Sequence, residues 1–260
     1  MACTRRSAGG WPLAHKMCAG KIMKRLIIAV ACLMMAACTT TAVRKADTVL
    51  APQAGATILL VEPRIQLSML TAGGVSEPRE EWSQDARANI QRHIQQAMLA
   101  DSHKFVVGNV DDLMDGRMGQ VVRVNEAVIA AIIAHEYNGY AGAKLATKKD
   151  DFEWTIGEGA KLVAEHFGAD YALFVSGNGT YASGGRIAAF VVASAFGVGI
   201  PLGQQQIMAS LVDLRTGQVV WVNYAIAGPG ADMRDETGAK SLVDSLLKDA
   251  PLSVKTDAAP

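Results

Sequence analysis

The sequence predicts an α/β (α+β) fold, a mixed β-sheet flanked by helices. Three observations support this prediction. Short apolar runs with strand periodicity recur along the chain, helical stretches with one apolar stripe lie between them, and a turn signal joins the last two strands. About 200 residues carry these patterns without an internal repeat, which is the size of a single domain.

The first half of the domain alternates strands with helices. Strands are expected over residues 57–61, 64–70 and 104–108, and the second of them alternates polar and apolar side chains. A helix is expected over about residues 80–100, because apolar residues recur there at three- and four-residue spacing. A further helix is expected over 121–137. The residues expected on its buried side are Val121, Val124, Val128, Ile132 and His135.

The second half begins with a helix and a central strand. Thr155-Ile156-Gly157-Glu158 matches a capping box, which predicts that the helix starts at Thr155. Gly168 stands where a left-handed C-cap belongs. The run 171–176 is apolar on both faces, as is typical of a strand inside a sheet. Its polar continuation over 177–181 indicates a strand end or a bulge.

Two strands and a helix complete the domain. Residues 206–212 and 218–225 are expected to form strands joined by a hairpin turn over 213–217, in which Gly217 supplies the positive φ. A final helix is expected over about residues 236–248, and Pro251 follows it closely enough to stop it.

The charge is unevenly distributed along the chain. The chain has 25 basic and 25 acidic residues, but residues 1–37 contain six basic residues and no acid. Without them, 19 basic residues face 25 acidic ones, a net charge of about −6. This balance argues against a nucleic-acid binder, and the 50% apolar content excludes a disordered chain.

The N-terminal segment has the pattern of a signal peptide. From Met23 the chain runs through Lys24 and Arg25 into an apolar stretch over residues 26–37, which is too short to span a bilayer comfortably. We expect residues 1–37 to be removed from the mature protein. Residues 1–22 carry no periodic pattern, so we expect translation to start at Met23, with a long n-region as the alternative.

The end of this segment, Met35-Ala36-Ala37-Cys38, resembles the bacterial lipobox, although Met35 replaces the usual leucine. The resemblance implies cleavage between Ala37 and Cys38, a diacylglycerol on the Cys38 thiol and an acyl chain, such as palmitate, on its new amine. Thr39 occupies the position where aspartate signals inner-membrane retention, which implies the outer membrane. The alternatives are an ordinary secretory signal or an uncleaved anchor.

The rest of the chain divides simply. Residues 38–55 are expected to be a flexible tether, 56–252 the periplasmic domain and 253–260 a loose tail. The four cysteines are Cys3, Cys18, Cys32 and Cys38, so the mature domain has no thiol for a disulfide, a zinc site or a nucleophile.

Two phrases carry a family resemblance. The sequence Gly168-Ala169-Asp170-Tyr171 before a strand, and the run from Leu211 to Trp221 with its Asp-Leu-Arg-Thr-Gly turn, resemble envelope lipoproteins that share the TolB N-terminal-like α/β domain. This group includes the curli-secretion lipoprotein CsgG. The resemblance covers about residues 56–250 and implies the fold and the compartment. The long paired hairpins of a CsgG-like membrane barrel are missing, so a pore is not implied.

Motifs for catalysis are weak. His135-Glu136 begins like HExxH, but Gly139 replaces the second histidine ligand. Gly177 and Gly179 lack the third glycine of a dinucleotide fingerprint. The acidic residues Asp111, Asp112 and Asp115 lack the glycine-centred pattern of a calcium loop. We therefore expect no catalytic residue, no metal and no cofactor.

One segment is unusual. Residues 187–203 are uncharged and mostly apolar, with Phe190, Val191, Phe196 and Ile200 as the candidate contact residues. One interpretation packs this segment on the sheet as a helix and a glycine-rich turn. The other makes it an insertion that faces a membrane or a partner.

These observations predict a lipoprotein of the outer membrane that faces the periplasm and acts as a non-enzymatic interaction or assembly module of the cell envelope. Its expected partners are the membrane, through the lipid, and other envelope proteins, with no nucleic acid. The first alternative is a subunit of an oligomeric secretion or assembly complex that uses residues 187–203, which includes a homo-oligomer. A small-ligand binder or an enzyme is the second.

Overall fold

The computed structural model describes residues 40–45, 52, 55–100, 104–109, 114, 116–137, 145–148, 152–227 and 231–252. The predicted signal peptide, the predicted cleavage residues Ala37 and Cys38, the predicted lipidation residue Cys38, and the tail over 253–260 lie outside the described residues. So do the acidic residues Asp111, Asp112 and Asp115. The described residues from 40 to 252 belong to one compact unit.

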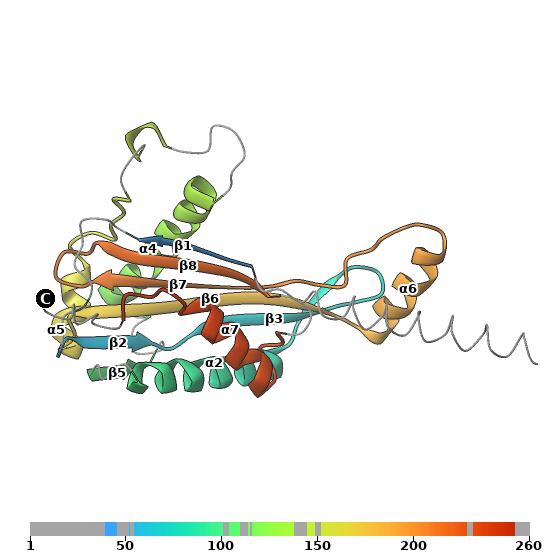
Figure 1. Cartoon of the computed structure of the whole chain (residues 1–260), viewed down its shortest axis with the longest axis horizontal. Helices are drawn as coiled ribbons and strands as arrows, with labels where there is room; N and C mark the ends of the chain where they lie inside the picture. The colour runs from blue at the N-terminus through green and yellow to red at the C-terminus, as the bar shows by residue number, and fades with distance from the viewer. Residues whose placement is uncertain are drawn as a thin grey trace, which may run out of the picture. The chain divides into compact units, whose positions relative to one another are not determined.

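The predicted mixed sheet is confirmed, and the described residues give it eight strands (Figure 1). Its main path runs β1-β8-β7-β6-β2-β5, and β3 pairs with β6 and β4. Strands β2, β3, β5 and β6 pair in parallel, whereas the pairs β6–β7, β7–β8, β8–β1 and β3–β4 are antiparallel. The strands are β1 (Thr40–Lys45), β2 (Thr57–Val61), β3 (Arg64–Leu70), β4 (Ser76–Pro78), β5 (Lys104–Gly108), β6 (Tyr171–Ala182), β7 (Gln205–Asp213) and β8 (Val219–Ala227).

Helices cover both faces of this sheet because its strands alternate apolar side chains between two cores. On one face, α2 and α7 pack on a cluster that includes Leu60, Leu173 and Trp221. On the other face, α4 and α5 pack on a cluster that includes Leu59, Ala172 and Val222. The helices are α2 (Glu80–Ala100), α4 (Gly116–Ile132), α5 (Ala160–Phe167), α6 (Gly184–Ala195) and α7 (Glu236–Leu246), with a π-helical turn η1 (Ile133–Tyr137) and a 3-10 turn η2 (Ala146–Lys148).

The two predicted helix ends had different outcomes. Gly168 is the left-handed C-cap of α5, with φ +63°, as predicted. The capping-box prediction is wrong, because α5 begins at Ala160 and its N-cap is Gly159. Thr155 instead bridges to Gln218 beside the last hairpin, and its hydroxyl donates to the Gly217 carbonyl. The Thr155 side chain therefore bonds to the hairpin and does not cap α5.

The predicted buried side of α4 is partly wrong. Val121 and Ile132 are buried as expected, but Val124 is exposed. Val122, Asn125 and Ile129 are buried in its place, so the helix is rotated toward the polar Asn125. Apolar residues also lie on both sides of the buried stripe, so the periodicity of the sequence could not show which of them face the core.

The expected strand end at residues 177–181 is a regular part of β6. The whole segment pairs with β3 on one edge, and residues 177–179 pair with β7 on the other, without a bulge. A Cβ on Gly179 would lie 3.0 Å from side-chain atoms of both Leu67 and Gln205. Glycine therefore permits close packing here, whereas in the sequence it resembles a break.

A strand also occupies part of the segment expected to be a tether. Residues Thr40–Lys45 form β1, which pairs antiparallel with β8 in the register Thr40 to Ile226 and Lys45 to Trp221. Three β-branched residues, Thr40, Thr41 and Val43, suit this edge position. The alanine- and threonine-rich composition around them gave no period and concealed the strand.

Candidate functional site

The unusual apolar segment forms a projection at one end of the sheet. β6 ends at Ala182, Ser183 caps α6, and the chain returns after Phe196 to start β7 at Gln205. Figure 1 shows α6 beyond the ends of β6 and β7, away from the four helices that cover the sheet. We call residues 183–204 the α6 projection.

The α6 projection contributes no described side chain to either core. None of the residues of α6 is buried. Val191 is 62% exposed and Phe196 is 81% exposed, whereas Phe190 and Ile200 are half-buried. The interpretation in which this segment packs on the sheet therefore fails for the helix itself. The four candidate contact residues lie on one projection, and Ile187, Val192, Val198 and Leu202 extend the exposed apolar surface.

Hydrogen bonds made by Ser183 and Arg186 stabilise the base of the projection. Ser183 accepts a hydrogen bond from the Arg186 backbone N–H, which caps α6. The Arg186 side chain donates from Nε to the Pro201 carbonyl at 3.0 Å and from Nη1 to the Ala72 carbonyl at 3.5 Å. Arg186 thus ties the outgoing helix to the returning chain and to the loop after β3, while the tip beyond it carries no charge.

A partly buried polar network lies directly below this base, and sequence analysis missed it. The Tyr181 hydroxyl lies within hydrogen-bonding distance of Gln205 on β7 and of Asp232, with 2.8 Å to the Asp232 carboxylate. The Arg234 guanidinium stacks on the Tyr181 ring at 3.7 Å and on the Trp82 ring at 4.6 Å. These contacts join α2, β6, β7 and the chain before α7 into one support.

The network raises the pKa of Tyr181 and lowers the pKa of Asp232. Burial, followed by the hydrogen bond with Asp232, raises the pKa of Tyr181, so its hydroxyl stays protonated. Burial also acts to raise the pKa of Asp232, but the hydrogen bonds from the Arg234 side chain and backbone outweigh burial and lower it. Arg234 donates to this carboxylate from Nη2 at 2.7 Å and from its backbone N–H at 2.8 Å. Asp232 is therefore ionised while it anchors the network.

The Asp232→Asn variant is expected to show a pH-dependent loss of stability. Since the folded-state pKa of Asp232 is lowered, its carboxylate stabilises the fold above the unfolded value of about 4, and this contribution disappears as the pH falls through the folded pKa. The variant should unfold at lower urea concentration than the parent at pH 7. The difference should shrink below about pH 4, as measured by urea unfolding at several pH values.

Asp244→Asn is the matched control for this prediction. Asp244 lies on α7 and pairs with Lys240 at 2.7 Å, but both side chains are exposed. Its replacement should change the free energy of unfolding by no more than about 0.5 kcal/mol, because exposed ion pairs contribute little. A parent–variant difference for Asp232→Asn that stays constant from pH 7 to pH 3 would contradict the role assigned to its carboxylate.

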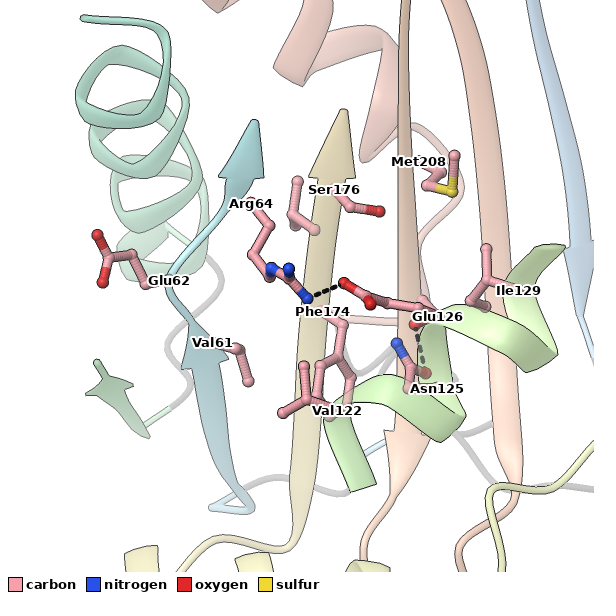
Figure 2. A pocket seen from close by; sticks show the side chains of 12 residues that line it. Val61, Glu62, Arg64, Val122, Asn125, Glu126, Ile129, Phe174, Ser176 and Met208 are labelled. Carbon is pink, nitrogen blue, oxygen red and sulfur yellow. Dashed lines mark hydrogen bonds and ion pairs between the residues drawn. The ribbon is translucent and has the colours of Figure 1, made fainter. Parts of the chain in front are cut away.

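A cleft of about 360 Å³, lined by apolar and polar side chains, lies elsewhere, between α4 and the sheet. Arg64 and Glu126 point toward each other within it and form an ion pair (Figure 2). The Ser210 hydroxyl donates to the side-chain oxygen of Asn125 at 3.2 Å. These four polar side chains partner one another, so the geometry favours a structural role for the cleft.

The histidines have separate structural places. His93 is buried on α2, with Nε2 3.1 Å from the Glu236 carbonyl and Nδ1 3.2 Å from Gln96 Oε1, so it links α2 to α7. His166 lies in the last turn of α5, and its ring packs edge-on against Phe167. His135 and Glu136 lie in η1. Within the described ranges, no group of three potential metal ligands comes together.

Comparisons with known proteins give no family assignment. No protein-family model matches the chain, and no curated protein matches it significantly. Solved structures that resemble it include the PelC dodecamer from Paraburkholderia phytofirmans, with TM-score 0.37 and 14% identity over 83% of this chain and 98% of that chain. Another is the lipoprotein GNA1162 from Neisseria meningitidis, with TM-score 0.31 and 15% identity over 74% and 94%. At TM-scores below 0.5, the TolB N-terminal-like resemblance stays a prediction.

Proposed function

We propose that the chain is a lipoprotein of the outer membrane that faces the periplasm and acts as a non-enzymatic interaction or assembly module of the cell envelope. The α6 projection carries this proposal. Its apolar side chains lie outside both cores of the domain, although water opposes their exposure. Contiguous apolar surface of this kind marks contact with a partner or a membrane.

The polar side chains of the described domain also support a non-enzymatic role. The cleft residues Arg64, Glu126, Asn125 and Ser210 form two internal pairs. His93 bridges two helices, and Asp232 anchors the network below the α6 projection. Each of these groups has a structural partner that accounts for its position.

The membrane attachment is inferred from the lipobox-like sequence that ends at Cys38. Lipoproteins of this type carry three acyl chains, and two or more chains are enough for stable attachment to a bilayer. Among the described residues, no helix combines the length and the apolar character needed to cross a membrane.

The Cys38→Ser variant is expected to lose acylation and outer-membrane attachment. Serine has no thiol to accept the diacylglycerol, so cells grown with radiolabelled palmitate should label the parent chain but not the variant. In a sucrose-density separation of envelopes, the parent should appear with the outer membrane and the variant should be absent from that fraction.

Cys32→Ser is the matched control, because Cys32 lies six residues earlier in the same apolar stretch and is not expected to carry lipid. This variant should label and fractionate as the parent does. A Cys38→Ser chain that still takes up palmitate, or that stays in the outer-membrane fraction, would show that the placement is wrong.

A further inference from the structure

We infer that the α6 projection inserts into the same bilayer that holds the N-terminal anchor, so that the domain contacts the membrane at two points. The inference rests on the proposed attachment at Cys38 and names the partner of the projection: the acyl region of one lipid leaflet. Three features of the described residues lead to it, namely strand register, the distribution of apolar side chains, and the backbone hydrogen bonds at the end of α6.

The strand register places the start of β1 and the base of the projection at the same end of the sheet. Thr40 pairs with Ile226 at the end of β8. The next residue of β8, Ala227, pairs with Gln205, where the chain returns from the projection. Gln205 in turn pairs with Gly179, close to the end of β6. The first residue of β1 and the two roots of the projection therefore form one row across the sheet.

Chain length keeps the anchor near this row. Cys38 precedes Thr40 by two residues, which span at most about 7 Å. β1 is separated from β6 by two strands, so the lateral distance across the sheet is about 15 Å. In the sequence, the apolar residues 26–37 directly precede Cys38. Acylation of Cys38 and retention of the apolar segment would therefore both bring the bilayer to this end of the domain.

The distribution of side chains on α6 favours lipid over a protein groove. Ile187 and Val191 lie one helical turn apart, and Val192 lies about 100° further round the axis. All three are exposed, and residues 187–203 carry no charge. A helix that is apolar over much of its circumference fits an apolar medium, whereas a groove binder needs one apolar face and a polar back.

The backbone at the end of α6 is hydrogen-bonded internally, which favours its entry into lipid. The amides of Phe196 and Val198 donate to the Ala193 carbonyl, and Gly197 donates to Ser194, so the last turn of α6 is closed. The 12 residues of α6 are about 18 Å long, less than the ~30 Å hydrocarbon thickness. The projection therefore enters one leaflet only. The charged Arg186, in the first turn of α6, stays at its base in water.

The test places a reporter at the tip of the lipidated, full-length protein. Phe196→Trp adds an indole at the most exposed large apolar side chain among the described residues, and Leu99→Trp adds one at a 65% exposed leucine near the C-terminal end of α2. Each protein is reconstituted into phosphatidylcholine vesicles with or without bromine on the acyl chains. The extra emission of Phe196→Trp should be quenched by the brominated lipid, and that of Leu99→Trp should not.

Insertion can also be measured without the lipid anchor. The full chain with Cys38→Ser should bind phosphatidylcholine vesicles weakly, and adding Phe196→Ser should weaken this binding by roughly tenfold, the effect of losing one buried apolar side chain. Because residues 187–203 are uncharged, raising the salt concentration should not release the chain.

The outcomes separate this inference from the proposed function. If Cys38 carries palmitate but Phe196→Trp is not quenched, the inference is wrong and the proposed function stands. If Phe196→Trp is quenched but Cys38 carries no acyl chain, insertion is supported and the proposed attachment is wrong. An unquenched, blue-shifted emission together with a larger particle size in detergent would show that another copy or another protein covers the tip, which also overturns the inference.

Discussion

Trp221→Ala is expected to lower the free energy of unfolding by about 3–5 kcal/mol, the usual cost of truncating a buried aromatic side chain. Trp221 is 0% exposed and lies on β8 within the core that α2 and α7 cover. Alanine would leave a cavity between the sheet and these helices, and neighbours on a paired strand can collapse into it only partly. Urea unfolding followed by circular dichroism measures the loss.

Phe196→Ala is the matched control, because it makes an aromatic-to-alanine change outside the core. Phe196 is 81% exposed on the α6 projection. Its replacement should change the free energy of unfolding by less than about 0.5 kcal/mol. A loss at Phe196 as large as that at Trp221 would mean that the projection belongs to the folded core, and this would contradict both proposals.

Gly217→Ala is expected to destabilise the last hairpin by about 2–4 kcal/mol, since it combines backbone strain with a steric clash. Gly217 has φ +73°, and a Cβ there would lie 2.2 Å from the Gly157 carbonyl oxygen. That approach is needed because the Gly217 carbonyl accepts hydrogen bonds from the Ile156 N–H and the Thr155 hydroxyl. The clash would separate the hairpin from the chain before α5.

Two further glycine-to-alanine variants divide this effect into its parts. Gly168 has φ +63° but open space around it, so Gly168→Ala measures strain alone and should cost about 1 kcal/mol. Gly184 has open space and no positive φ, so Gly184→Ala should be neutral or slightly stabilising. Thermal or urea unfolding of the three variants should give this order. Equal losses at Gly168 and Gly217 would show that the clash is relieved without cost.

The local patterns in the sequence predicted most elements because their causes are local. The stripe of α2, the central strand that begins at Tyr171 and the turn that ends at Gly217 all appear as expected. The errors occur where a distant segment decides the structure. Thr155 resembles a helix cap in the sequence, but in the structure its hydroxyl donates to the carbonyl of Gly217 in the hairpin. Gly179 resembles a strand break, but in the structure it leaves room for the close side chains of Leu67 and Gln205.

The same limit applies to the candidate site. An uncharged run of residues could be recognised in the sequence, but its exposure depends on where β6 and β7 end. The network of Tyr181, Asp232 and Arg234 joins residues about 50 positions apart and has no motif. In the sequence these residues appear only as a tyrosine near the end of a strand and a distant Asp-x-Arg turn.

The pairing of β1 sets how far the domain could stand from the attachment point proposed at Cys38. While β1 is paired with β8, almost no slack remains between Cys38 and the sheet. Peeling the six residues of β1 away from this edge would release about 20 Å of extended chain. An edge strand is hydrogen-bonded to a single neighbour, so it can detach while the remaining strands stay paired. The length of the free tether before the domain therefore depends on whether β1 is paired.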